Sequence, residues 1–431
     1  MSVFNFDDFN DKIDQLNYRV VDDEVLNDNF ALEEEEFDDE EHEADADDEV
    51  IEFNGTSGNK FKARRGSLSV DLNMQSPFIS RSVKGDNDSF YKPTLEDFQP
   101  IKVLGKGSYG KVLLVQQIST GKLFAQKQLK KISLLMNEEK NLERTLNERK
   151  ILEKVNHVNI VRLFYAFQDF NKVYLILEYL DGGELFYHLS QEQYLSETSA
   201  SFYIAQLILA LRYLHLELNV IYRDLKPENC MLNSEGNLVL TDFGLSKVIE
   251  EDERNHSFIG TIQYMAPEIL KNEAYSYEVD WWSLGCIAFD LLTGSPPFTG
   301  NNNKKITEKI LASKKNLKFP FYLSLDAKNF LRKLLVVNID KRLNLDDDEI
   351  FEKIKKDRFF RKVDWNLIND NRSLPPILPI ITNPILAENF DKQFTEMEFT
   401  PPNKFNDDIL HVKDFTFTND KFLNNYYEMK K

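Results

Sequence analysis

Runs of apolar residues with strand-like spacing dominate the chain between Phe98 and Leu180, and a cluster of glycines interrupts them once. One charged stretch among them, Leu142 to Val155, has the pattern of a surface helix. We therefore predict a small, mostly β lobe with one main helix over residues 98–180. The expected strands include Ile101 and Val103, Val112 to Val115, Lys122 to Leu129, and Val173 to Tyr179.

After Asp181-Gly182-Gly183 the pattern changes from strand-like to helical spacing. Amphipathic helices need apolar residues every three to four positions, and several long segments have them. We predict a second, mainly α lobe over residues 181–360. The fold class is therefore α+β, with two lobes. The clearest helical segments are Thr198 to His215, Val279 to Thr293, and Ala327 to Val336.

The two ends of the chain differ from this centre. Residues 1–92 are acidic and lack sustained periodicity, so they are predicted to be a disordered regulatory segment. Residues 361–431 are irregular and rich in Pro, but aromatic residues recur there where a solvated tail would have few. We expect this C-terminal segment to wrap on the two lobes. Its aromatic residues include Phe390, Phe394, Phe399, Phe415 and Phe417.

The charge is unevenly distributed. Residues 1–60 contain 22 Asp or Glu and 3 Lys or Arg, so their net charge of −19 equals that of the whole chain. The acidic character thus belongs to one end and not to the folded lobes. Cys230 and Cys286 are the two cysteines, and we expect both to be reduced. We find no leader and no run of about 20 apolar residues, and we expect a soluble protein of the cytoplasm or nucleus without membrane or nucleic-acid partners.

The motif Tyr222-Arg223-Asp224-Leu225-Lys226-Pro227-Glu228-Asn229, followed by Asp242-Phe243-Gly244, contains the groups that phosphoryl transfer requires. In this order the chain resembles a eukaryotic protein kinase, with Tyr222 in place of the usual His, as in the AGC group. The resemblance implies ATP and Mg²⁺ as cofactors. It makes Asp224 the base for the substrate hydroxyl, Lys226 the charge on the γ-phosphate, and Asn229 and Asp242 the magnesium ligands.

The glycine-rich segment Gly105-Lys106-Gly107-Ser108-Tyr109-Gly110 is expected to fold over the phosphates. The same glycine spacing opens dinucleotide-binding folds, but there it leads into a helix, whereas here a strand follows. An ordinary hairpin turn is the simpler alternative. The residues expected to contact ATP are Leu104, Gly105, Lys106, Gly107, Ser108, Tyr109, Gly110, Lys111, Val112, Ala125, Lys127, Glu178 and Phe390.

Lys127 stands in the place of the lysine that binds the α- and β-phosphates, and Glu148 is its expected helix partner. Glu268 is expected to pair with Arg342, and Asp280 to order the catalytic loop. Because all these polar groups are present, we favour an active enzyme. The alternative from another class is an inactive pseudokinase scaffold that binds partners through its tails.

Substrate choice is predicted from four further residues. Lys226 with Thr261 resembles the serine/threonine pattern. Glu184, Glu228 and Asp290 occupy positions where basophilic kinases of this group hold arginines upstream of the acceptor. We therefore expect substrates with Arg two, three or five residues before Ser or Thr.

Four candidate phosphorylation sites are apparent. Ser257 matches the activation-loop site, Thr400 resembles the turn motif, and Thr416 the hydrophobic motif, although Val412 replaces its first aromatic residue. Ser67, in Arg64-Arg65-Gly66-Ser67, matches a basophilic kinase consensus or is part of a basic spacer. We expect phosphate on Ser257 to pair with Arg223, and phosphate on Thr416 to dock the tail.

Within the group the chain is most similar to the ribosomal protein S-six kinases over residues 98–420, and fungal Ypk or Sch-nine kinases and protein kinase B are near alternatives. The resemblance rests on Gly182-Gly183-Glu184-Leu185-Phe186, Tyr222 to Asn229 and Phe390-Asp391. It implies an upstream AGC-activating kinase, the TOR complex and a ribosomal protein substrate as partners. Val3 to Asp8 is similar to the motif that recruits TOR, or is a chance match.

Overall fold

The computed structural model describes residues 93–107, 110–136, 139–249, 255, 260–398 and 411–419. The chain divides into two units, 1–86 and 87–431, and every described residue lies in the second. The acidic segment 1–92 therefore lies outside the described residues, as do Ser67, Ser108, Tyr109, Ser257 and Thr400.

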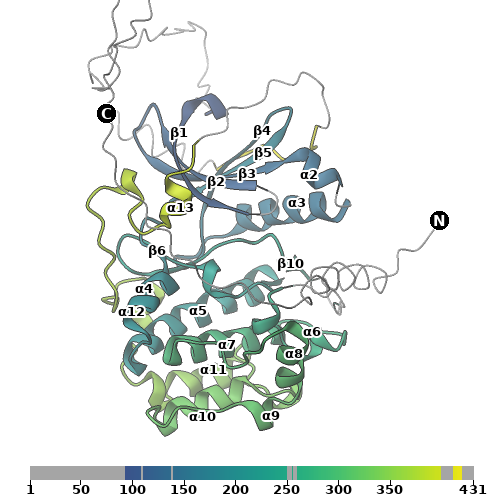
Figure 1. Ribbon diagram of the computed structural model, residues 1–431, viewed down its shortest axis with the longest axis vertical. Coiled ribbons are helices and arrows are strands. Elements are labelled where there is room, and N and C mark those ends of the chain that lie inside the picture. Colours follow the sequence, from purple (N-terminus) through teal and green to yellow (C-terminus); the bar gives the residue numbers. More distant parts are fainter. Residues whose placement is uncertain are drawn as a thin grey trace, which may run out of the picture. The chain divides into compact units, whose positions relative to one another are not determined.

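The small lobe is built on a six-stranded sheet in the order β1-β2-β3-β5-β4-β11, in which neighbouring strands are antiparallel (Figure 1). Its central strands are buried on both faces, in agreement with their nearly continuous apolar sequence. A short helix follows β3 directly, where the sequence predicted only one main helix. The elements are η1 (Leu95–Asp97), β1 (Phe98–Lys106), β2 (Gly110–Gln117), β3 (Leu123–Lys130), α2 (Lys131–Met136), α3 (Glu139–Lys154), β4 (Leu163–Gln168) and β5 (Lys172–Glu178).

The glycine-rich turn joins β1 to β2, so the glycines lie in a hairpin and not before a helix. Gly110 needs to be glycine for a steric reason: a Cβ atom there would lie 1.8 Å from the Gln128 carbonyl oxygen of β3. Gly105 and Gly107 instead face open space. Gly110 thus packs closely on β3, while Gly105 and Gly107 leave open space beside the hairpin.

The large lobe is mainly helical, and α5 and α7 form its centre. α5 (Glu197–Leu218) begins at Ser196, whose hydroxyl accepts a hydrogen bond from Ser199 N, and ends at Asn219 in the left-handed region. The other elements are β6 (Gly183–Glu184), α4 (Leu185–Glu192), β7 (Val220–Ile221), η2 (Pro227–Asn229), β8 (Cys230–Leu232), β9 (Leu238–Leu240), β10 (Lys247–Val248), η3 (Ile262–Tyr264), α6 (Pro267–Leu270), α7 (Glu278–Thr293), α8 (Asn303–Leu311), α9 (Ser313–Asn316), α10 (Leu325–Leu334), η4 (Ile339–Lys341), α11 (Asp348–Lys355) and η5 (Arg358–Phe360).

One buried ion pair fastens the helical lobe. Arg342 donates to both carboxylate oxygens of Glu268, at 2.6 and 2.9 Å, and both side chains are only 1% exposed. The expected Glu268–Arg342 pair is confirmed. Because removal of one partner would strand a buried charge, breaking such a pair costs about 3–5 kcal/mol.

The C-terminal segment contacts both lobes where it is described. Its elements are α12 (Trp365–Asn369), η6 (Pro384–Leu386), α13 (Lys392–Thr395) and β11 (Phe417–Thr418). α12 packs on α5, α13 lies against β1, and β11 pairs with β4 at the sheet edge (Figure 1). Val412 and Phe415 are buried. The aromatic residues of this segment thus predicted its packing correctly.

Among the described residues, no helix is both long enough and apolar enough to cross a membrane.

Candidate active site

A cleft of about 990 Å³ is lined by the glycine hairpin, β3 and α3 of the small lobe, and by the catalytic loop and the tail. Most of the residues predicted to hold ATP and substrate meet here. Those that line it are Leu104, Gly105, Lys106, Gly107, Gly110, Lys111, Val112, Lys127, Glu148, Glu184, Asp224, Lys226, Glu228, Asp242 and Phe390.

Lys127 on β3 is the centre of the polar part. Its Nζ lies 2.7 Å from Glu148 Oε1 on α3 and 2.9 Å from Asp242 Oδ1. Burial of the ammonium acts to lower the pKa of Lys127, but Asp242 and Glu148 outweigh it and hold the pKa above its ordinary value. Lys127 therefore stays positively charged, as an ion that binds phosphate oxygens must.

Glu148 is the partner whose charged form is disfavoured by burial. Its side chain is 2% exposed, and burial raises the pKa of its carboxyl despite the opposing charge of Lys127. Any movement of α3 that removed Lys127 would leave a buried carboxylate without its cation. The position of α3 and the charge at the site are therefore coupled.

The apolar part of the cleft receives residues from three segments. Leu104 packs in one cluster with Val112, Ala125 and Phe390. The Phe390 ring stacks on Tyr179, with ring centroids 6.0 Å apart and the planes 20° from parallel. The tail therefore contributes an aromatic ring to the wall of the cleft, and contact between Phe390 and adenine stays a prediction.

Glu178 differs from the other predicted ATP contacts. Its carboxylate lies 3.5 Å from the Arg162 guanidinium, and its main-chain N–H donates to the Arg162 carbonyl. The side chain thus faces Arg162. Any contact between Glu178 and a nucleotide would have to use its main chain.

Asp224 lies in the loop between β7 and β8, and it is 5% exposed. Its Oδ2 accepts hydrogen bonds from Lys226 Nζ at 2.8 Å and from Asn229 Nδ2 at 3.0 Å. Its Oδ1 is buried and accepts no hydrogen bond from the residues that the structure describes. Burial raises the pKa of Asp224, and Lys226 and Asn229 oppose that shift. The unsatisfied oxygen can accept the hydroxyl hydrogen of a substrate, and Thr261 lines a small hollow beside it.

The residues predicted to bind magnesium are suited to a hard cation. Lys127 holds the pKa of Asp242 below its ordinary value, so this carboxylate is ionised and faces the cleft. Asn229 uses its amide nitrogen toward Asp224, which leaves the amide oxygen as the ligand atom. Asp242 and Asn229 would hold Mg²⁺, which when bound neutralises developing phosphate charge.

Arg223 and Asp242 both have left-handed backbone, with φ of 63° and 54°. Such strain costs about 1–3 kcal/mol at each residue and is typical of active sites.

Asp280 on α7 orders the catalytic loop, as predicted. Its carboxylate accepts hydrogen bonds from Tyr222 N at 2.7 Å and Arg223 N at 2.8 Å. It also contacts His215 Nε2 at 2.9 Å, and His215 Nδ1 contacts Asp346 at 2.9 Å. Burial acts to lower the pKa of His215, but the bonds to Asp280 and Asp346 raise it to about 9. This buried cation was not predicted from the sequence, because a single His on a helix has no distinguishing pattern.

Arg223 is half-buried, and its guanidinium donates to the Leu245 carbonyl at 2.7 Å and toward the Tyr275 hydroxyl at 3.4 Å. Both partners are neutral and no carboxylate pairs with Arg223 among the residues that the structure describes, so its charge can attract an anion. Ser257, its predicted partner once phosphorylated, lies outside the described residues.

Two of the three predicted substrate carboxylates line the cleft, and the third does not. Glu184 and Glu228 line it, whereas Asp290 is buried behind Tyr264, whose hydroxyl donates to it at 2.9 Å. The pKa of Glu184 is raised by partial burial of its carboxyl and by Glu228 and Asp391. Burial raises the pKa of Asp290 to about 6. Asp391, in the tail, was not among the predicted residues, because its proximity to Glu184 follows only from the wrapped tail.

The tail is fixed to the small lobe by a pair of hydrogen bonds that the sequence did not predict. Val412 N donates to Gln168 Oε1 at 2.9 Å, and Gln168 Nε2 donates to Val412 O at 2.8 Å. The Arg149 guanidinium of α3 lies over the Phe417 ring, and its central carbon is 5.3 Å from the centroid of that ring. Thr416 itself is exposed. Because of the two hydrogen bonds with Gln168, Val412 packs on the small lobe and is buried, although it stands where an aromatic residue was expected.

Residues 98–360 match the family model described as the protein kinase domain, and the chain belongs to this family. It is a serine/threonine protein kinase of the AGC type, related to Ypk and ribosomal S6 kinases. It is 45% identical over 364 residues to serine/threonine-protein kinase YPK3 of Saccharomyces cerevisiae, 47% over 306 residues to ribosomal protein S6 kinase beta of Caenorhabditis elegans, and 44% over 321 residues to ribosomal protein S6 kinase alpha-2 of Homo sapiens.

These matches cover 71%, 70% and 74% of this chain, in the same order. They cover 69% of the yeast relative, but only 55% and 42% of the other two. The match therefore spans only about half the length of the two animal relatives.

Proposed function

We propose that this kinase transfers the γ-phosphoryl group of Mg²⁺-bound ATP to Ser or Thr residues that follow arginines, and that it acts downstream of TOR. The observation that carries the substrate preference is the pair Glu184 and Glu228. Both line the cleft, and neither has an Arg or Lys partner among the described residues. Two neighbouring carboxylates without a cation bind an arginine side chain well, because each accepts two charge-assisted hydrogen bonds.

The proposed chemistry uses the contacts described above. Asp224 orients the substrate hydroxyl through its unpaired oxygen and accepts its proton, while Lys226 faces the transferred phosphoryl group. Lys127 binds the α- and β-phosphates, and Glu148 fixes its position. Phe390 and Leu104 enclose the adenine.

Regulation is proposed to require two phosphates. Phosphate on Ser257 would pair with Arg223, whose present partners are neutral. Phosphate on Thr416 would strengthen a tail that β11 joins to β4 and Phe417 joins to Arg149 of α3, and so stabilise the Lys127–Glu148 pair. The names of the relatives support a ribosomal protein as substrate. We extend the proposal to an upstream AGC-activating kinase, to the TOR complex, and to a location in the cytoplasm or nucleus.

The substrate preference is tested with two peptides that differ only in their arginines. We expect phosphate transfer from Mg²⁺-ATP to a peptide containing Arg-Arg-x-Ser, and at least a tenfold lower kcat/KM for the same peptide with Ala in place of Arg. Glu184→Gln together with Glu228→Gln should abolish this difference by raising KM for the first peptide alone. Equal rates for both peptides in the unmodified enzyme would refute the preference.

The control for chemistry is Asp224→Asn, which keeps the side-chain shape and removes the proton acceptor. It should stop transfer to both peptides. Ser257→Ala and Thr416→Ala test the two-input switch, and each alone should lower activity. If each variant kept full activity, the regulatory proposal would fail while the catalytic one stood.

A further inference from the structure

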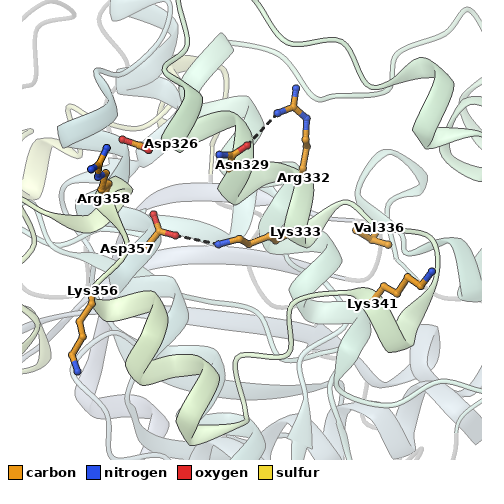
Figure 2. A pocket seen from close by; sticks show the side chains of 9 residues that line it. All are labelled: Asp326, Asn329, Arg332, Lys333, Val336, Lys341, Lys356, Asp357 and Arg358. Carbon is orange, nitrogen blue, oxygen red and sulfur yellow. Dashed lines mark hydrogen bonds and ion pairs between the residues drawn. The ribbon is translucent and has the colours of Figure 1, made fainter.

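A second hollow, of about 680 Å³, lies in the large lobe between α10, η4, the end of α11 and η5. It shares no lining residue with the catalytic cleft. Figure 2 shows its centre crossed by Lys333 and Asp357, with Lys341 to one side and Lys356 and Arg358 to the other. The lining residues are Asp326, Asn329, Arg332, Lys333, Val336, Lys341, Lys356, Asp357 and Arg358.

The charge of this hollow is unbalanced. Five cations and two carboxylates line it, and both carboxylates already have a partner: Asp357 lies 3.2 Å from Lys333, and Asp326 lies 3.8 Å from Arg361. Three exposed cations, Lys341, Lys356 and Arg358, have no ion-pair partner among the residues that the structure describes. The hollow therefore has net positive charge that the protein itself does not neutralise.

The cations project from a firmly packed base. Arg332 is oriented by Asn329 Oδ1 at 3.3 Å and by the Phe319 ring, 4.8 Å from its guanidinium carbon. Arg358 immediately precedes Phe359 and Phe360, which are buried against Phe330 with ring centroids 5.0 and 5.1 Å away. Because the backbone beneath these charges is held in place, a bound anion would not have to order it.

We propose that this hollow is a docking site for an acidic peptide segment of a protein partner, separate from the substrate site. Carboxylates of an extended peptide would pair with Lys341, Lys356 and Arg358, and Val336 offers an apolar contact at the Lys341 end. A peptide fits better than nucleic acid, because Asp326 and Asp357 divide the positive surface into separate points. A peptide can place its acidic residues at those points, whereas a phosphate backbone carries charge along its whole length.

The test uses the full chain and a labelled ten-residue peptide composed of Glu and Asp with one central Leu, and it measures binding by fluorescence anisotropy. Binding should weaken about tenfold or more when Lys341, Lys356 and Arg358 are each changed to Glu, and it should weaken as salt rises. The matched control changes three exposed lysines of the same lobe, Lys304, Lys314 and Lys315, to Glu. This control alters net charge equally and should change binding less than about twofold.

Activity on the short Arg-containing peptide verifies that both triple variants are folded, because neither set lines the catalytic cleft. A full-chain variant in which Glu33 to Glu36 and Asp38 to Glu41 are changed to amides removes competition by the chain's own acidic run. Binding seen only in that variant supports an acidic occupant of the hollow, but it identifies that occupant as this run in place of a partner's segment.

Three outcomes would overturn the proposal: equal weakening by both triple variants, no binding in either background, or binding of an oligouridylate that the peptide does not displace. All three concern binding at the second hollow. They are therefore distinct from a failure of phosphoryl transfer.

Discussion

Replacing His215 by Gln should weaken the folded enzyme in a pH-dependent way. His215 is 2% exposed and lies between Asp280 and Asp346, with nitrogen–oxygen distances of 2.9 Å to each. Its pKa of about 9 exceeds the ordinary value of 6.5, so the folded state binds a proton more tightly than the unfolded state. Gln carries no charge, and its single amide nitrogen cannot take the places of both ring nitrogens of His215.

The size of the effect follows from the two pKa values. A shift from 6.5 to about 9 corresponds to about 3 kcal/mol of stabilisation by the protonated form. Because the folded pKa is raised, this stabilisation is fully present below pH 6.5 and is lost as the pH rises through 9. We therefore expect the difference in unfolding free energy between wild type and His215→Gln to be about 3 kcal/mol larger at pH 6 than at pH 10.

The assay is urea denaturation of both proteins at unit steps from pH 6 to pH 10, because subtraction cancels titrations that the two share. His157→Gln is the control. Burial lowers the pKa of His157 to about 4, so it is neutral in the folded state over this range and its difference should be flat above pH 7. A wild-type minus His215→Gln difference that does not change between pH 6 and pH 10 would refute the reasoning.

Further predictions concern the cleft and the tail. Glu148→Gln removes the charge that fixes Lys127 and should lower kcat by about 10²-fold with little change in KM for ATP; a raised KM with unchanged kcat would contradict this. Phe390→Ala removes the aromatic wall and should raise KM for ATP roughly two- to tenfold, whereas an unchanged KM would show that the tail does not contact adenine. The predicted role of Asp290 in holding a substrate arginine requires an ionised carboxylate, so under that prediction KM for the Arg peptide should rise as pH falls below about 6, the pKa to which burial raises this carboxyl, and Asp290→Asn should show a high KM at all pH values. Phe415→Ala empties a fully buried position and should cost about 3–5 kcal/mol, with faster hydrogen exchange at the amides of β11; unchanged exchange there would exclude its anchoring role.

The two-lobed architecture could be predicted from the sequence because the period of apolar residues changes once, after Gly183. The helix of Glu148 was predicted within three residues at its start and one at its end. α5 continues three residues beyond the predicted His215, because the capping Asn219 was not recognised as a helix end. α2 was missed, because six residues with little charge pattern follow a strand without a break.

The residues of the site also differ in how far the sequence could predict them. Residues within a contiguous motif, such as Asp224 and Asn229, could be assigned because the motif fixes their order and spacing. Contacts across distant segments could not: Gln168 meets Val412 over 244 positions, and His215 meets Asp346 over 131. Nothing in local spacing brings these pairs together, since their proximity depends on the packing of the completed fold.

The pairing of β11 with β4 determines the order in which the small lobe can fold during translation. Phe417 is opposite Ala166 and Thr418 opposite Tyr165, so the sheet of the first lobe is closed by a strand translated about 250 residues later. At usual elongation rates that gap is roughly 10–50 s, during which β4 is an edge with unpaired main-chain groups. The β4 edge of the nascent lobe is therefore open to wrong strand pairing until β11 has been translated, and a chaperone that shields β4 would act in that interval.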